Sequence, residues 1–283
     1  MRAYAGPAVA EFAPAKLNLA LHVTGRRADG YHLLDSLVVF AAVGDRITLA
    51  PGQGIALSGP FAADLPGEEN LCLRAARLMG LHAAIGLEKV LPVASGIGGG
   101  SADAAAVLRG FARGGEALPA AEAITRLGAD VPVCLAGRPA RMRGVGEVLD
   151  PVPALPALHL VLVNPGVAVA TPAVFAALET RDNPGLPPLP ARFADASALL
   201  GWLAATRNDL EPPARRIRPV IGAALDALTQ AGAQVARMSG SGATCFGLFA
   251  SAAAAGAACA RIKAAEPGWW AVATGLAPGD ASR

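Results

Sequence analysis

The chain has 283 residues, 53% of them hydrophobic, and its 24 Lys and Arg against 22 Asp and Glu give a formal net charge of +2. This length allows one or two domains with substantial cores, and the near balance of charge excludes a strongly basic nucleic-acid-binding protein. Aromatic residues make up only 5% of the chain, which argues against a stacking platform for single-stranded nucleic acid.

The first half of the chain is predicted to begin with strands and to continue with helices. Apolar, β-branched runs predict strands over residues 8–13, 17–24, 33–40 and 46–50, separated by turns at residues 28–30 and 43–45. Helical spacing predicts helices over residues 69–79, 101–113 and 119–127. A short strand over residues 87–91 ends at Pro92, and a glycine-rich loop, residues 95–100, precedes the second helix.

The proline-rich stretch of residues 150–156 is the expected connector between two domains, residues 1–155 and 156–283. Beyond it, strands are expected over residues 159–163, 233–238, 244–249 and 269–274, with a loop over residues 183–190. Helices are expected over residues 171–180, 213–231 and 251–265, the first with Thr171 as N-cap and Pro172 as first helical residue. This order predicts an α+β protein whose second half is ferredoxin-like with extra helices.

The termini and cysteines indicate a cytoplasmic protein without a membrane span. Pro7, Glu11 and Pro14 interrupt the first apolar stretch, so it does not resemble a secretory signal. No aliphatic run approaches the ~20 residues that cross a bilayer. The four cysteines lack CxxC or zinc-ligand spacing and are expected to be buried, reduced thiols, and the scattered histidines argue against a transition-metal enzyme.

The strongest local signal is the segment PVASGIGGGSADAA, residues 92–105. Four glycines in five positions leave the backbone open to an anion, and the helix that follows directs unpaired N–H groups and its positive dipole end toward the loop. The segment is neither a P-loop nor the GxGxxG dinucleotide motif. A flexible, solvent-facing lead-in to the helix is the alternative interpretation.

Two further segments support a phosphate site. Residues 239–243, Ser-Gly-Ser-Gly-Ala, join two apolar strands, and the alternative interpretation is an ordinary hairpin turn. Near the N-terminus, a strand period of two places Lys16 and Asn18 on one face, with Leu17 and Leu19 on the other. The alternative for Lys16 is an edge-strand lysine that points to water.

Together these segments resemble the GHMP kinases, named for galactokinase, homoserine kinase, mevalonate kinase and phosphomevalonate kinase. The resemblance rests on APAKLNLALHVTGRRADGYHL at residues 13–33, the glycine segment, GADVPV at 128–133, NDLEPP at 208–213 and MSGSGATCF at 238–246. It runs in the expected order from about residue 10 to about residue 250. The block GRRADGYH resembles that of members whose substrate carries a cytidine.

The resemblance implies the two-domain GHMP kinase fold and phosphoryl transfer from ATP to the tertiary 2-hydroxyl of 4-(cytidine 5′-diphospho)-2-C-methyl-D-erythritol, a step of the non-mevalonate isoprenoid precursor pathway. A hindered tertiary alcohol needs positioning, a proton acceptor and positive charge on the transferred group. The residues implied to bind ATP are Pro92, Val93, Ala94, Ser95, Gly96, Ile97, Gly98, Gly99, Gly100, Ser101 and Ala102, with Gly240 and Gly242 from the second domain.

Asp130 matches the family's general base, and Lys16 matches its catalytic lysine. The lysine is expected to lower the proton affinity of the hydroxyl and to favour the ionised carboxylate. A helix N-cap ahead of Val131 and Pro132 is the alternative role for Asp130.

The remaining implied site residues bind the alcohol substrate. Tyr31 and Phe175 match the two stacking aromatics of the cytosine site, and His32 matches the residue that hydrogen-bonds the pyrimidine edge. Asn18 and Thr171 are implied to orient the erythritol part and the backbone on the base side. Packing in the core is the alternative role for Phe175.

Ala102 stands where many family members have a second serine, so any contact of that hydroxyl is absent or supplied elsewhere. No second carboxylate for Mg²⁺ is evident, and we expect the metal to be held by phosphates, water and Ser101. The expected partners are the two small-molecule substrates, with no nucleic acid or membrane, in a monomer or homodimer. Two alternative functions remain: that of another GHMP kinase, and that of a nucleotide-binding protein of this fold that has lost catalysis.

Overall fold

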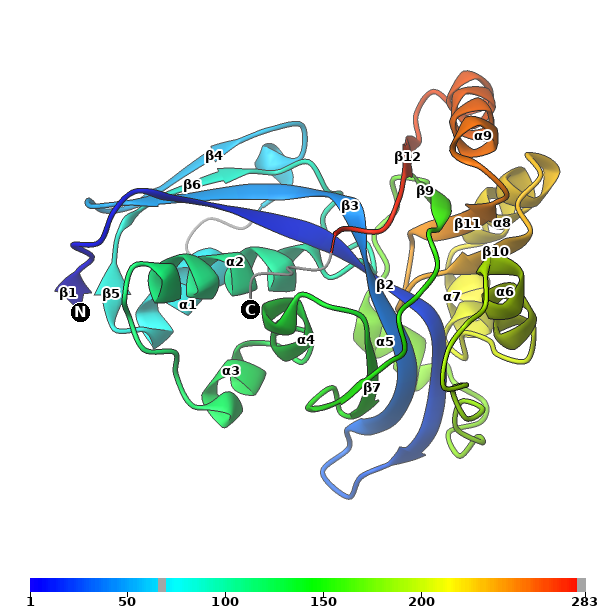
Figure 1. Cartoon of the computed structure of the whole chain (residues 1–283), viewed down its shortest axis with the longest axis horizontal. Helices are drawn as coiled ribbons and strands as arrows, with labels where there is room; N and C mark the ends of the chain where they lie inside the picture. Colours follow the sequence, from blue (N-terminus) through cyan, green and yellow to red (C-terminus); the bar gives the residue numbers. More distant parts are fainter. Residues whose placement is uncertain (66–69, 279–283) are drawn as a thin grey trace. The chain divides into compact units, whose positions relative to one another are not determined.

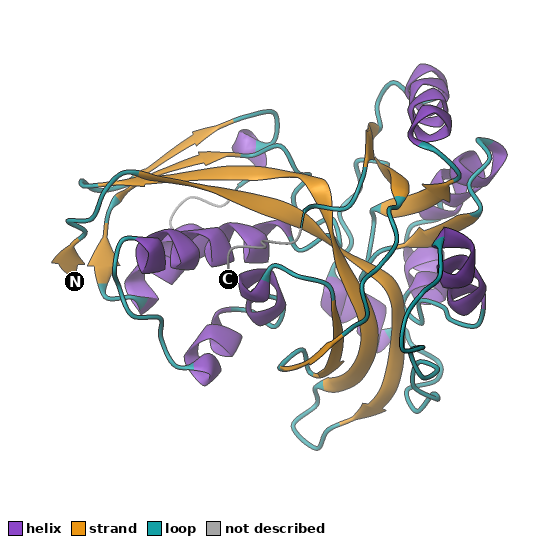
Figure 2. Cartoon of the chain, viewed as in Figure 1, coloured by secondary structure: helices purple, strands orange, loops and turns teal. Residues whose placement is uncertain are grey.

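The computed structural model describes residues 1–65 and 70–278. The chain forms two compact units, and each unit is built from several segments that alternate along the sequence. Figure 1 colours the chain by residue number, and Figure 2 colours its helices and strands. Unit 1 comprises Met1–Lys16, Val43–Val93 and Gly98–Arg138, and unit 2 comprises Leu17–Ala42, Ala94–Ile97 and Pro139–Arg283. The boundary expected between residues 155 and 156 stays a prediction.

Unit 1 combines helices with the beginning of one long strand, β2 (Val9–Arg26), and the end of another, β3 (His32–Ala50). Its shorter elements are β1 (Arg2–Ala3), β4 (Ile55–Ser58), the 3₁₀ turn Ala62–Asp64, α1 (Leu71–Leu78), β5 (Leu81–His82), β6 (Ala84–Glu88), α2 (Gly99–Arg113), α3 (Ala121–Leu127) and α4 (Val131–Ala136). The end of β3 (His32–Ala50) pairs antiparallel with β6, and β4 pairs parallel with β6. Helix α2 lies close against this sheet because Gly110 has no Cβ, which would lie 2.5 Å from Leu49 Cδ1.

Unit 2 contains a four-stranded antiparallel sheet. The strands are β9 (His159–Asn164), β10 (Val235–Met238), β11 (Cys245–Phe249) and β12 (Trp270–Thr274), in the order β10-β11-β9-β12. The intervening helices are α5 (Thr171–Ala176), α6 (Ala196–Ala204), α7 (Glu211–Ile217), α8 (Val220–Gln230) and α9 (Ala252–Ala265). This strand order is that of the ferredoxin-like fold and confirms the expectation for the second half.

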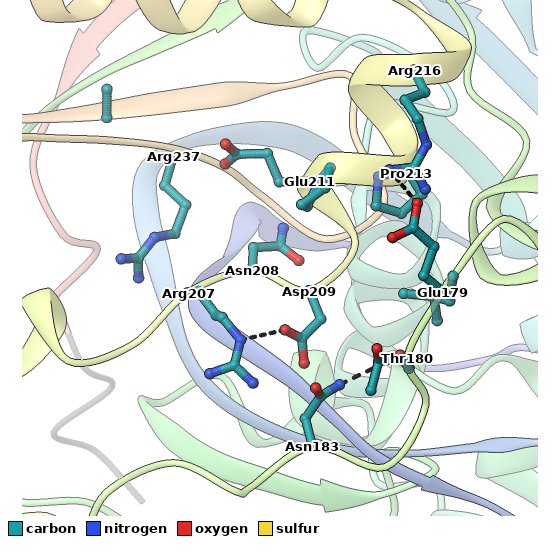
Figure 3. Close-up of a pocket in the computed structure, with 13 residues that line it drawn as sticks. Glu179, Thr180, Asn183, Arg207, Asn208, Asp209, Glu211, Pro213, Arg216 and Arg237 are labelled. Carbon is teal, nitrogen blue, oxygen red and sulfur yellow. Dashed lines mark hydrogen bonds and ion pairs between the residues drawn. The ribbon is translucent and has the colours of Figure 1, made fainter.

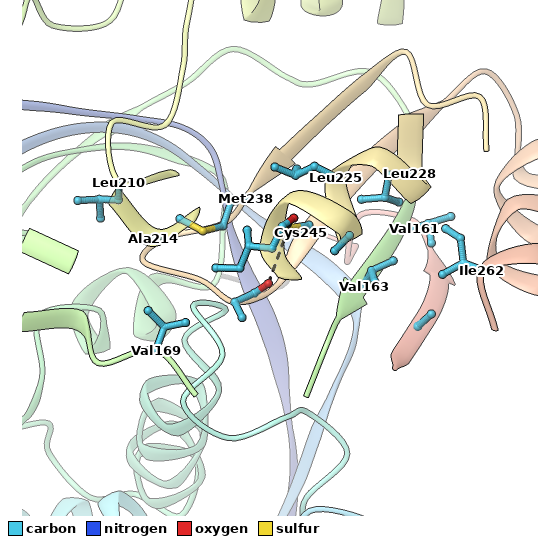
Figure 4. Close-up of a cluster of buried hydrophobic side chains, with 14 of the residues drawn as sticks. Val161, Val163, Val169, Leu210, Ala214, Leu225, Leu228, Met238, Cys245 and Ile262 are labelled. Carbon is cyan, nitrogen blue, oxygen red and sulfur yellow. Dashed lines mark hydrogen bonds between the residues drawn. The ribbon is translucent and has the colours of Figure 1, made fainter. Parts of the chain in front are cut away.

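The core of unit 2 consists of aliphatic side chains from the sheet and its helices (Figure 4). Val161 and Val163 of β9 are fully buried, together with Leu228 of α8. The beginning of β3 also belongs to this unit, where it pairs antiparallel with β7 (Ala140–Gly144), which in turn pairs with β8 (Val148–Pro151). Burial of one face of each strand fixes its register.

The strands expected in the first fifty residues are longer than predicted. One strand, β2 (Val9–Arg26), replaces the two expected over 8–13 and 17–24, and β3 continues through the turn expected at residues 43–45. Gly44 makes this continuity possible, because a Cβ there would lie 2.3 Å from the Ala13 carbonyl oxygen of the neighbouring strand. The turn at residues 28–30 is confirmed, with Gly30 at φ +92°.

Several helix predictions also need correction. The helix expected over 213–231 is two helices, α7 and α8, because Pro219 cannot continue the hydrogen-bonding pattern of a helix interior. Helix α5 ends at Ala176 rather than at residue 180, and Thr171 is its first residue rather than its N-cap. Helix α2 begins at Gly99, two residues early, and α6 was not predicted. The expected start of the first helix at Glu69 lies outside the described residues.

Candidate active site

Lys16 and Asp130 form an ion pair in unit 1. Lys16 Nζ lies 2.9 Å from Asp130 Oδ2, and the Lys16 side chain is 4% exposed while that of Asp130 is 32% exposed. Lys16 is therefore not an edge lysine that points to water. Asp130 occupies the N-cap position of α4, but its side chain makes no capping hydrogen bond and is directed to Lys16 instead. This arrangement leaves a partly accessible carboxylate beside a buried ammonium group.

The glycine loop brings the start of α2 to this ion pair. Gly98 is the N-cap of α2 in the left-handed conformation, with φ +64°, and a Cβ there would lie 3.1 Å from Lys16 Cε and 3.8 Å from Asp130 Oδ2. Gly99 and Gly100 already belong to the helix, so α2 directs its unpaired N–H groups toward the same place. Ser101 follows in the first turn and is half-buried.

The first part of the loop belongs to unit 2, where it packs on the second glycine turn. Ser239 Oγ donates to the Gly96 carbonyl oxygen at 3.1 Å. A Cβ on Gly240 would lie 2.7 Å from the same carbonyl oxygen, and one on Gly96 would lie 2.5 Å from the backbone carbonyl oxygen of Ser239. Gly240 and Gly242 have φ of +55° and +86°. The turn between β10 and β11 is a hairpin connection, as one interpretation held, and it also lies in backbone contact with the glycine loop.

The other loop residues predicted to bind ATP are spread over both units. Pro92, Ser95, Ile97 and Ala102 are buried, Val93 is half-buried, and Ala94 is exposed with φ +51°.

Asn18 is fully buried in unit 2 beside the same turn. Its Nδ2 donates to Ser36 Oγ at 2.7 Å, and Ser36 Oγ in turn donates to the Ala20 carbonyl oxygen at 2.7 Å. Its backbone N–H donates to Ser239 Oγ, and its Oδ1 would lie 3.4 Å from a Cβ on Gly240. Asn18 is thus held rigidly, with its amide oxygen directed toward the glycine turn.

Two of the predicted substrate residues, His32 and Phe175, are in contact in unit 2. The ring of His32 stacks on Phe175, with centroids 4.7 Å apart and planes at 22°. Phe175 packs at the edge of the unit's core, and Tyr31 is 63% exposed. Thr171 shares a 2.7 Å hydrogen bond with Ser241 Oγ in the glycine turn. His32 therefore covers one face of Phe175.

His32 is a neutral imidazole, and one of its ring nitrogens makes no hydrogen bond among the described residues. Burial lowers its pKa below the usual value, and Arg26 and Arg181 lower it further. Its Nε2 is buried and has no hydrogen-bond partner among the described residues. A buried ring nitrogen without a partner is costly, and a ligand that supplied one would recover that cost.

Sequence reasoning missed a second charged cluster next to the glycine loop. Lys89 Nζ lies 2.6 Å from Asp45 Oδ2 and 2.7 Å from Asp103 Oδ2. Burial, and then Asp45, raise the pKa of Asp103 to about 7 although Lys89 opposes this, while the two carboxylates raise the pKa of Lys89 against the effect of its burial. The available signal was that Lys89 is one of three lysines in the chain and precedes the glycine motif.

A cavity of ≈ 500 Å³ lies elsewhere in unit 2, beside α7 (Figure 3). Three arginines line it, and each is already engaged. Arg207 pairs with Asp209 at 2.5 Å, Arg216 pairs with Glu179 at 3.2 Å, and Arg237 donates to three backbone carbonyls and a hydroxyl. None of the predicted site residues lines this cavity.

Comparison with known proteins decides the family. Residues 70–138 match the N-terminal domain of GHMP kinases, and residues 190–268 match their C-terminal domain. A 4-diphosphocytidyl-2-C-methyl-D-erythritol kinase of Paracoccus denitrificans (strain Pd 1222) is 65% identical over 271 residues, which cover 95% of this chain and 97% of that protein. The chain belongs to the GHMP kinases, among the 4-diphosphocytidyl-2-C-methyl-D-erythritol kinases.

Solved structures agree with this assignment. A crystal structure of 4-(cytidine 5′-diphospho)-2C-methyl-D-erythritol kinase is 36% identical, with a TM-score of 0.78 over 96% of this chain and 100% of that one. A homoserine kinase from Cytophaga hutchinsonii is 19% identical, with a TM-score of 0.62 over 95% of this chain and 94% of that one, and shows the common fold. The GHMP kinase fold and family predicted from the motifs are therefore confirmed.

As a GHMP kinase the chain uses ATP. No group of three or more His, Cys, Asp or Glu side chains among residues 1–65 and 70–278 could hold a metal ion, and all four cysteines are free and buried. Within the same residues no helix is both long and apolar enough to cross a membrane.

Proposed function

We propose that this kinase transfers the γ-phosphoryl group of ATP to the 2-hydroxyl of 4-(cytidine 5′-diphospho)-2-C-methyl-D-erythritol, with Asp130 as general base and Lys16 as electrostatic stabiliser. The observation that carries the assignment of roles is the 2.9 Å Lys16–Asp130 pair beside Gly98, the left-handed N-cap of α2. We take the proposed substrate from the names of the similar kinases, which include it.

The ion pair has the properties that the reaction needs. The partly exposed Asp130 carboxylate accepts the hydroxyl proton as the substrate oxygen forms its bond to the γ-phosphorus and the bond to the ADP oxygen breaks. The Lys16 ammonium stabilises the negative charge that grows on the substrate oxygen, and its burial strengthens that interaction. The hydroxyl proton is then carried by Asp130, and the oxygen that bridged the β- and γ-phosphorus atoms leaves with ADP.

The glycine loop supports binding of the nucleotide phosphates. The first N–H groups of α2 have no partners within the helix, and the helix dipole adds positive potential at the same end. Side chains on the glycines would occupy this space, since a Cβ at Gly98 would approach Lys16 within 3.1 Å. These features favour an anion at the start of α2.

In unit 2, the neutral His32 and the ring of Phe175 support recognition of cytosine. The unpaired Nε2 of His32 can hydrogen-bond the edge of the base, and a base can stack on an aromatic face. Because His32 covers Phe175 in this structure, we infer that the imidazole turns aside when cytosine stacks between Phe175 and Tyr31. Thr171 and Asn18 remain the proposed contacts for the rest of the substrate.

Magnesium is proposed to arrive with ATP. The donor set fits a metal held mainly by phosphate oxygens and water, with the Ser101 hydroxyl as the protein ligand in the first turn of α2. The bound metal would neutralise charge on the β- and γ-phosphates. The cytoplasm as the compartment and a monomer or homodimer as the assembly stay predictions.

The proposal is tested by measuring ADP release with each candidate acceptor alcohol. We expect turnover with 4-(cytidine 5′-diphospho)-2-C-methyl-D-erythritol and none with homoserine or mevalonate at the same concentration. Turnover of homoserine or mevalonate alone would assign a different acceptor. ATP binding without turnover of any of the three would indicate a nucleotide-binding protein that has lost catalysis.

A further inference from the structure

Three charged side chains that the proposed chemistry does not use lie buried together in unit 1. Asp45, Lys89 and Asp103 are 0%, 1% and 2% exposed. One ammonium group is shared by two carboxylates, at 2.6 Å and 2.7 Å. Burying charges is costly even when they are paired, so an arrangement that buries three calls for an explanation beyond stability.

The cluster holds both ends of the glycine loop. Asp45 Oδ1 accepts hydrogen bonds from the backbone N–H groups of Val90 at 2.6 Å and Leu91 at 2.8 Å, immediately before the loop. Asp103 lies on α2, four residues after Gly99 at the other end of the loop. Lys89 connects the two carboxylates, and a Cβ on Gly99 would lie only 3.0 Å from its Nζ. The ammonium group therefore lies directly against the first residue of the helix.

One atom of the cluster is left unsatisfied. Asp103 Oδ1 is buried and has no hydrogen-bond partner among the described residues. An apolar side chain of similar size at this position would avoid that cost, and replacing buried ion pairs with apolar residues is often neutral or stabilising. The carboxylate is therefore better explained by the position it imposes on α2 than by a contribution to stability.

We propose that Asp45, Lys89 and Asp103 are positioning residues for nucleotide binding, which fix Leu91 and Gly99 so that the first N–H groups of α2 point at the phosphates. This inference rests on the proposed role of the glycine loop. Donors that are already oriented before the ligand arrives bind it without the cost of ordering them. The cluster acts through the loop and does not contact either substrate.

The same helix offers a matched control. Arg109, six residues beyond Asp103 on α2, is 8% exposed and donates to Glu11 Oε2 at 3.0 Å and to the carbonyl oxygens of Cys134 and Phe12. This network is also buried and charged, but it lies away from the glycine loop along the helix. Arg109→Lys weakens it while keeping the charge.

The test compares Lys89→Met with Arg109→Lys in steady-state kinetics, urea unfolding and backbone hydrogen exchange. For Lys89→Met we expect the KM for ATP to rise about tenfold or more, because small displacements of binding groups have effects of this size. The KM for the alcohol and kcat at saturating ATP should stay within about threefold. The amide of Ala102, which donates to the Gly98 carbonyl oxygen at 2.8 Å, should exchange faster. Arg109→Lys should lower the urea midpoint and leave the KM for ATP unchanged.

A second variant keeps the test valid if Lys89→Met does not fold. The double variant Lys89→Met/Asp103→Leu removes both the Asp103 carboxylate and the Lys89 ammonium group. Asp45 stays hydrogen-bonded to two backbone N–H groups. It should fold and still show the raised KM for ATP. A KM for ATP equal to that of the native protein in either folded variant, or the same kinetic change in Arg109→Lys, would overturn the inference.

The native protein separates this result from a failure of the proposed function. If it shows no ATP-dependent turnover, the proposed function fails. If it turns over ATP and Gly98→Val weakens ATP binding while the Lys89 variants do not, only the positioning role is wrong.

Discussion

Two lysine–aspartate groups lie against the first turn of α2, and they differ in what their carboxylates can reach. A Cβ on Gly98 would meet Lys16, and one on the adjacent Gly99 would meet Lys89. The Asp130 side chain is 32% exposed, whereas those of Asp45 and Asp103 are at most 3% exposed. A carboxylate that accepts a proton from substrate must be within hydrogen-bond reach of it, so the difference in exposure favours Lys16 and Asp130, rather than the buried cluster, as the proposed reactive pair.

The largest expected effect comes from removing the reactive pair. Asp130→Asn keeps the shape of the side chain but removes the proton acceptor, and kcat should fall by about 10²–10⁴. Lys16→Met should cause a loss of similar order, and both variants should still bind ATP. Lys263→Met on α9 and Asp150→Asn, at a residue whose side chain is 40% exposed and paired with Arg143, are the controls and should keep native kcat. Near-native turnover of Asp130→Asn would show that another group takes the proton.

Substitution of Gly98 should weaken ATP binding. Gly98→Val places a branched side chain at φ +64° and against Lys16, where strain is about 1–3 kcal/mol. Gly115→Val is the matched control, because Gly115 follows the other end of α2 at φ +93° with nothing within 4 Å of a Cβ. Both variants should lose stability, as urea unfolding would show, but only Gly98→Val should raise the ATP dissociation constant. An equal ATP affinity in the two would contradict the phosphate-binding role.

Removal of the Tyr31 ring in unit 2 should change the KM for the alcohol substrate and not the KM for ATP. Stacking of a base on an aromatic ring is worth about 1–3 kcal/mol, so Tyr31→Ala should raise the KM for the cytidine substrate by roughly 5- to 150-fold. The KM for ATP should be little changed. Tyr31 is 63% exposed, so the variant should unfold at nearly the native urea concentration. If the substrate KM did not move, Tyr31 would have no part in the site.

Discrimination between bases should depend on His32. The uridine analogue exchanges a donor for an acceptor at the 4-position and leaves polar groups of the site unpaired. The native protein should therefore have a much lower kcat/KM for it, and His32→Ala should lose most of that discrimination. Equal use of both substrates by the native protein would show that cytosine is not recognised.

The smallest expected effect is the pH dependence of substrate binding. Because burial, Arg26 and Arg181 lower the pKa of His32, the imidazole is neutral at pH 7 and gains a proton only below its ordinary value of about 6.5. The KM for the cytidine substrate should be flat above that pH and rise severalfold as the pH falls below it. His32→Ala should lack this step, and a step retained in that variant would assign it to another group.

Much of this protein could be predicted from its sequence because the signals are local. Period-two and helical patterns gave the strands β9–β12 and helix α9 to within two residues at each end, and hence the ferredoxin-like order. Five motifs in a fixed order gave the family, since each preserves a backbone shape or a chemical group at a fixed spacing. Lys16 and Asp130 were paired only through the resemblance, because 114 residues separate them and no periodicity connects them.

The tertiary structure decided what depends on contacts between distant segments. Asp45 looked like a turn residue beside Gly44, but the strand continues there because the Ala13 carbonyl oxygen needs the space of a missing Cβ. Asp45 then meets Lys89 across 44 residues of chain. Thr171 looked like a helix cap, but Ser241 takes its hydroxyl. Local sequence fixes backbone preference and amphipathic pattern, whereas the partners of a buried polar group are set by the packing of whole elements, which no short window of sequence contains.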